Sequence, residues 1–99
     1  MVFEKYRLRH NMNNFCYYSM ALHKEIESQK NTRCRNMPLI EDYSKRASKY
    51  GRKARDLSNK LGIALEEGFT NTLSAVETIY NSCITYHNQA KFNKIVMQN

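Results

Sequence analysis

Six cationic side chains in the middle of the chain have the residue types and the spacing that suit binding to a polyanion. They are Lys45, Arg46, Lys49, Arg52, Lys53 and Lys60. On a helix that advances about 100° per residue they fall on one arc about 120° wide. Only two acids, Asp42 and Asp56, share that arc. Because such a face can contact successive phosphates and release counterions, we expect it to bind a polyanion, most simply nucleic acid.

The net charge of the chain agrees with an anionic partner. It is +7 at pH 7, and residues 1–37 and 38–62 each contribute +4 whereas residues 63–99 contribute −1. Charge of this kind informs about partners and solubility. Two alternatives remain open. The face is a plain solvated exterior, or it docks an acidic protein surface, as an inhibitor or adaptor of a virus or mobile element would. Arg7 and Tyr17 can add backbone or stacking contacts, although their spacing does not require it.

Two of the cysteines have settings that bear on metal binding and redox chemistry. Cys83 lies four residues before His87, a spacing that can hold a metal ion when two further ligands, such as Cys16 and His23, come from elsewhere. No C-x-x-C pair is present, and both residues lie on an apolar stripe where a packed thiol and imidazole are common. We therefore expect neither metal nor cofactor. Cys34 lies between two arginines, which favour its thiolate, but an incidental surface cysteine is the simpler interpretation.

The sequence lacks the motifs of catalysis. It contains no glycine-rich phosphate loop and no nucleophile elbow, and three helices of this length rarely enclose a pocket. We expect a binding or regulatory protein and not an enzyme. Three widely spaced cysteines and the lack of an apolar leader at the N-terminus indicate a reducing cytoplasm, which is the host cytoplasm if the protein is viral.

An amphipathic helix over about residues 39–61 must position the cationic face. Its apolar positions are spaced 4, 3, 4, 3 and 4 residues apart and form one stripe: Tyr43, Ala47, Tyr50, Ala54, Leu57 and Leu61. Pro38, the sole proline, suits the first turn, and Glu41 and Asp42 complement the positive end of the helix dipole.

Two further helices flank the central one. Phe15, Tyr18, Leu22 and Ile26 recur with helical period and predict a shorter helix over about residues 15–29, capped by Asn13 or Asn14. A long helix over about residues 64–92 carries a broad apolar face. Its members are Leu65, Phe69, Leu73, Val76, Tyr80, Cys83, His87 and Ala90. Gly62, before that helix, is either a left-handed cap or a glycine within a longer helix.

These elements predict an all-α protein, with residues 1–99 forming a single helical domain. Two long antiparallel helices form a small bundle, and the shorter N-terminal helix covers them. Three glycines and one proline are too few for the turns of an all-β fold. No apolar run approaches the length of a membrane span. The apolar stripes exceed what one hairpin buries, so a homodimer is plausible.

Two short stretches resemble known families. Leu57, Ser58, Leu61, Gly62 and Ile63 resemble the first helix and turn of a helix-turn-helix, but the second half departs from it, with Gly68 and Asn71 at apolar positions and Glu66 and Glu67 at the recognition-helix start. Residues 65–76 resemble the second helix of phage anti-defence proteins that sequester cyclic nucleotides. The matching residues are Leu65, Gly68, Phe69, Ala75 and Val76. This second resemblance implies sequestration of an anionic nucleotide, with no site residues assigned.

Overall fold

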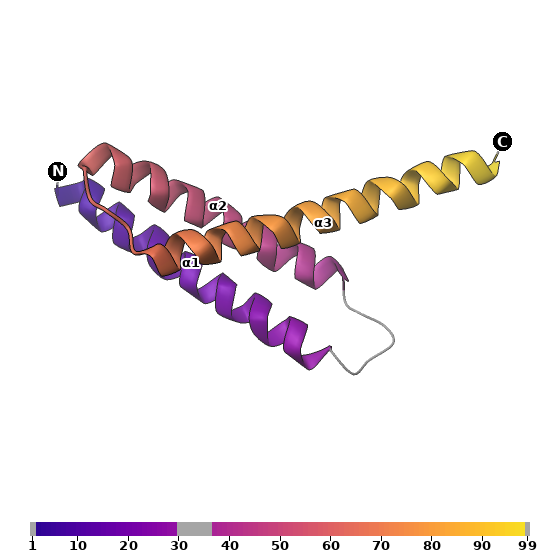
Figure 1. The fold of residues 1–99 in the computed structure, drawn as a ribbon, viewed down its shortest axis with the longest axis horizontal. Helices are drawn as coiled ribbons and strands as arrows, with labels where there is room; N and C mark the ends of the chain where they lie inside the picture. Colours follow the sequence, from indigo (N-terminus) through magenta and orange to yellow (C-terminus); the bar gives the residue numbers. More distant parts are fainter. Residues whose placement is uncertain (1, 30–36, 99) are drawn as a thin grey trace.

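Three α-helices are the regular secondary structure of the computed structural model, which describes residues 2–29 and 37–98. Helix α1 spans Val2–Ser28, α2 spans Met37–Leu61 and α3 spans Glu67–Gln98. Figure 1 shows α1 and α2 side by side as an antiparallel hairpin, with α3 crossing the hairpin obliquely. The predicted all-α bundle is therefore confirmed. No helix within the described ranges is both long enough and apolar enough to cross a membrane.

Helix α1 is much longer than the predicted helix over residues 15–29, and the predicted asparagine cap is wrong. The chain is helical from Val2 onward, so Asn14 lies inside the helix. Its side-chain Nδ2 donates to the carbonyl of His10 at 2.8 Å, and Asn11 Nδ2 donates to the carbonyl of Arg7 at 2.9 Å. These asparagines bond to carbonyls one turn earlier instead of the free amides at a helix start, which lets the helix continue through them.

Helix α2 ends at a glycine cap, and the prediction for its extent is confirmed to within two residues. Gly62 has a φ of 67°, in the left-handed region where glycine pays no steric cost. The amide of Ile63 donates to the carbonyl of Ser58 at 2.9 Å, and that of Gly62 donates to Asn59 at 3.3 Å. This pair of bonds is a Schellman motif, so the helix stops here.

Helix α3 begins and ends later than the predicted range of 64–92. Residues 63–66 are not helical, and Glu66 accepts backbone bonds from Phe69 and Thr70 at 3.0 and 3.3 Å. The chain therefore needs a short connection after the cap before α3 can turn back across the hairpin. At its other end α3 continues to Gln98, and every residue from 85 to 97 is exposed.

The core depends on small residues along α2. The buried positions of that helix are Ile40, Ser44, Ala47, Ser48, Gly51, Ala54 and Ser58. A Cβ atom at Gly51 would lie 2.6 Å from Leu73 Cδ1 of α3 and 2.8 Å from Phe15 Cδ2 of α1. The lack of a side chain at this position lets three helices meet. The predicted stripe is one edge of this face, since Ala47 and Ala54 are fully buried but the large members are half-buried.

The C-terminal half of α3 projects from the hairpin and lengthens the molecule. The radius of gyration is 16.5 Å, compared with about 13 Å for an ordinary domain of this length. Figure 1 shows the C-terminus far from the hairpin. The apolar face predicted for this helix is therefore divided: Leu73, Val76 and Cys83 are buried, whereas His87 and Ala90 are exposed.

Replacing Gly51 with alanine is expected to destabilise the fold. The added Cβ must displace two side chains that are themselves buried, at a cost of about 1–3 kcal/mol, which exceeds the gain of about 1 kcal/mol in helix propensity. The measurement is urea unfolding followed by circular dichroism. Gly68→Ala is the matched control, because a Cβ there meets no atom within 4 Å, and it should be neutral or slightly stabilising. Equal stability of the two variants would contradict this account of the core.

Candidate nucleic-acid interface

The structure places all six predicted cations on the exposed side of α2. We call this set the cationic face: Lys45, Arg46, Lys49, Arg52, Lys53 and Lys60. By helical geometry their side chains point away from the buried residues of the same helix. The packing of α1 and α3 on the opposite side therefore keeps the cationic face free of the core.

Two members of the cationic face form ion pairs with neighbouring helices. Lys60 Nζ lies 2.8 Å from Glu4 Oε1 of α1, and Arg52 Nε lies 3.0 Å from Glu77 Oε1 of α3. Both cations keep more than half of their side-chain surface exposed. Such pairs hold the ends of the face in position, while each contributes little to stability because solvent screens it.

The centre of the cationic face has more cations than carboxylates. Arg46 Nε donates to Asp42 at 3.1 Å, and this hydrogen bond, with a further one to Tyr18, raises the pKa of the guanidinium. Three lysines form no ion pair with any carboxylate in residues 2–29 and 37–98: Lys45, Lys49 and Lys53. These lysines are charges available to an external anion.

A row of aromatic rings runs beside these cations, between α1 and α2. Tyr18 and Tyr50 stack with their planes parallel and their centroids 5.8 Å apart. His10 meets the edge of Tyr50 at 6.4 Å. The Arg46 guanidinium and the Lys49 ammonium each lie 5.7 Å from a ring centroid, over Tyr18 and Tyr50 respectively. The cations are thus fixed against rings, which limits their motion and reduces the entropy lost when they bind an anion.

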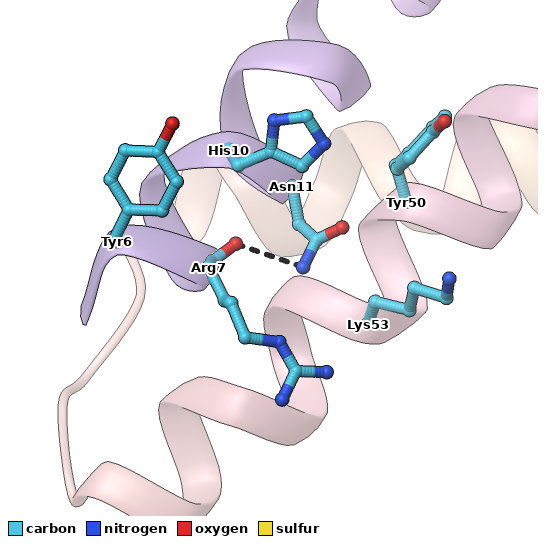
Figure 2. A pocket seen from close by; sticks show the side chains of 6 residues that line it. All are labelled: Tyr6, Arg7, His10, Asn11, Tyr50 and Lys53. Carbon is cyan, nitrogen blue, oxygen red and sulfur yellow. Dashed lines mark hydrogen bonds between the residues drawn. The ribbon is translucent and has the colours of Figure 1, made fainter. Parts of the chain in front are cut away.

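At one end of this row the two helices enclose a groove of about 380 Å³. Its lining, which we call the α1–α2 groove, consists of Tyr6, Arg7, His10, Asn11, Tyr50 and Lys53. Figure 2 shows these side chains arranged around one opening, with Arg7 from α1 and Lys53 from α2. No carboxylate lines the groove. Two permanent cations, an imidazole and an amide therefore face the same space, a combination that suits a phosphate group.

Most of this groove was not predicted from the sequence. Lys53 was included, and Arg7 was named as a possible addition, but the other four residues were missed. The signal was present, because Tyr6 and His10 are four residues apart and must share a helix face. It was lost because the first helix was predicted to begin only at Phe15. The extension of α1 back to Val2 is what carries Arg7 and His10 to the side of α2.

The other candidate sites are not assembled. Within the described ranges no group of three or more histidine, cysteine, aspartate or glutamate side chains is placed to hold a metal ion. Cys83 is buried, and burial, together with the charge of Glu41, raises the pKa of its thiol. His87 Nδ1 lies 3.5 Å from Glu41 Oε2 instead of facing a metal. Cys16 is exposed, and Cys34 lies outside the described residues.

The ion pair between Glu4 and Lys60 should make stability depend on acid pH. The hydrogen bond and the charge of Lys60 hold the pKa of Glu4 below its ordinary value of 4.5. Since the folded-state pKa is the lower one, the pair stabilises the fold above the unfolded-state pKa and loses this effect as pH falls through the folded-state pKa. Glu4→Gln should therefore lower Tm at pH 7 and have less effect near pH 3. An equal change in Tm at both values would contradict the pairing.

No protein-family model, curated protein or solved structure matches this chain, so its fold and its surface carry the functional argument.

Proposed function

We propose that the protein is a non-enzymatic nucleic-acid-binding protein whose ligand lies along the cationic face and in the α1–α2 groove. One observation carries the proposal: Lys49, Lys53 and Arg7 gather beside aromatic rings in a groove region without a lining carboxylate. A surface that served solubility alone would mix both signs of charge. Clustered cations beside rings instead provide phosphate contacts and stacking in one place.

A single strand suits this surface better than a duplex does. Tyr6 and Tyr17 of α1 are 70% and 66% exposed, so their rings are accessible to bases. The bases of a duplex are already stacked on one another, whereas those of a single strand can stack on protein rings. Lysine contacts and ring stacking do not depend on the identity of the base, and we expect binding to tolerate changes of sequence.

The double substitution of Lys49 and Lys53 by glutamate should weaken binding and its dependence on salt. Each lost phosphate contact on a single strand lowers the slope of log K against log salt by about 0.7, so the two together should lower it by about 1.4. The measurement is a salt titration of oligonucleotide binding by fluorescence anisotropy.

The matched control for this experiment is Lys91→Glu with Lys94→Glu. It changes the net charge by the same amount, at exposed positions on the projecting part of α3. It should leave the slope nearly unchanged. Equal losses in the two double variants would attribute binding to net charge and contradict the site. Retention of a protein partner in a pull-down after nuclease treatment, without oligonucleotide affinity, would favour the acidic-protein alternative.

Replacing Tyr6 with alanine should weaken single-strand binding about tenfold, since stacking is worth about 1–3 kcal/mol per base. Duplex binding should change less, because a duplex offers no free base to the ring. Tyr86→Ala is the control, because Tyr86 is similarly exposed at 64% but lies on α3. Affinity should also rise with strand length. Saturation by a mononucleotide with full affinity would instead support the sequestration of a small anionic nucleotide.

A further inference from the structure

The side of α3 that faces away from the hairpin is uncharged over more than four turns. At 100° per residue eight exposed residues fall on one arc about 120° wide. We call this arc the outer face: Thr78, Asn81, Ser82, Thr85, Asn88, Gln89, Phe92 and Val96. In a chain where 25% of residues are charged, an exposed face of this length without one charge is unusual. It is therefore suited to contact a protein surface.

The outer face changes in size along its length. Its first half has small hydroxyl and amide residues, and a shallow depression lies there between Thr78 and Tyr86. Its second half has Phe92 and Val96, which are 63% and 54% exposed. Large side chains at one end and a depression at the other are complementary when two such faces meet in opposite directions.

The hydroxyl groups of the first half are already satisfied within the helix. Thr78 Oγ1 donates to the carbonyl of Ser74 at 3.0 Å, Ser82 Oγ donates to Thr78 at 3.0 Å, and Thr85 Oγ1 donates to Asn81 at 2.9 Å. Burying an unsatisfied donor costs about 1–3 kcal/mol, and these bonds avoid that cost. This half of the outer face can therefore be covered by an apolar side chain without leaving a hydroxyl donor unpaired.

We infer that α3 pairs antiparallel with α3 of a second copy of the chain, through the outer face. A two-fold axis near residue 87 sets Phe92 of each copy opposite Ser82 of the other, and Val96 opposite Thr78. Each contact occurs twice, as a two-fold interface requires. The uncharged face avoids repulsion where it matters, although each chain carries a net charge of +7. The inference does not depend on the proposed nucleic-acid binding.

A second copy explains the projecting helix better than other occupants do. Residues 85–97 are all exposed, and an isolated helix of about a dozen residues is marginal in water. Pairing over residues 78–96 makes a contact about 27 Å long and buries on the order of 800–1,000 Å² in total, at the low end for specific interfaces. The dimer should therefore be concentration-dependent. A membrane is a poorer occupant, because the amides of Asn81, Asn88 and Gln89 lie on this face.

The oligomeric state of the full chain tests the inference. Sedimentation equilibrium from about 1 to 300 µM should show a reversible monomer–dimer equilibrium, a range suited to an interface of this size. Phe92→Glu should weaken dimerisation about tenfold or more. Met97→Glu is the control, because Met97 is 86% exposed but lies about 140° around the helix from Phe92. Both variants should keep the helicity of the hairpin.

Disulfide trapping tests the antiparallel direction. In a background with Cys16 and Cys34 replaced by serine, a mixture of Thr85→Cys and Gln89→Cys chains should form mixed disulfides faster than either variant forms its own. Faster self-linking of each variant would indicate parallel pairing and overturn the inference. A monomer at all concentrations would also overturn it. So would equal effects of Phe92→Glu and Met97→Glu, or binding of vesicles of anionic lipid by a monomeric chain with loss in Phe92→Glu.

Discussion

The close approach of three helices at Gly51 is the constraint on which the rest of the structure depends. Side chains from α1 and α3 occupy the space where a Cβ would lie. Serines and alanines continue this narrow face along α2, and the hydroxyls of Ser44 and Ser58 donate to carbonyls of their own helix at 3.0 and 2.7 Å. Polar side chains can therefore be buried there at little cost, which is why a helix with few large apolar residues occupies the centre of the bundle.

The position of the cationic face follows from this packing. Helix α2 is in contact with α1 on one side of its buried face and with α3 on the other, so one side remains for solvent. The lysines and arginines occupy that side. Because α1 borders it, the surface available to a ligand is formed by two helices. The aromatic rings between them are half-buried, so they are held rigidly but remain near the surface.

The central helix could be predicted from sequence because its charge and apolar patterns have the same period. The rest was harder for identifiable reasons. Ser44 and Ser48 count as polar in any periodicity, so the second half of the buried face was invisible until the approach of α3 showed it. The asparagines near residue 13 resembled a cap because asparagine favours caps, yet here tertiary packing of Leu8 and Phe15 on one continuous helix prevails. Without that helix the groove lacks one wall.

The outer face of α3 and the cationic face of α2 point away from the core on different helices, so pairing through α3 leaves the cationic faces uncovered. A dimer would then present two copies of the α1–α2 groove. A long strand that reaches both would bind the second at a raised effective concentration, whereas a short strand would occupy one alone. The contact between copies is small and the ion contacts are screened by salt, so each is modest separately. Their coupling through strand length would give this small protein affinity that neither surface provides by itself.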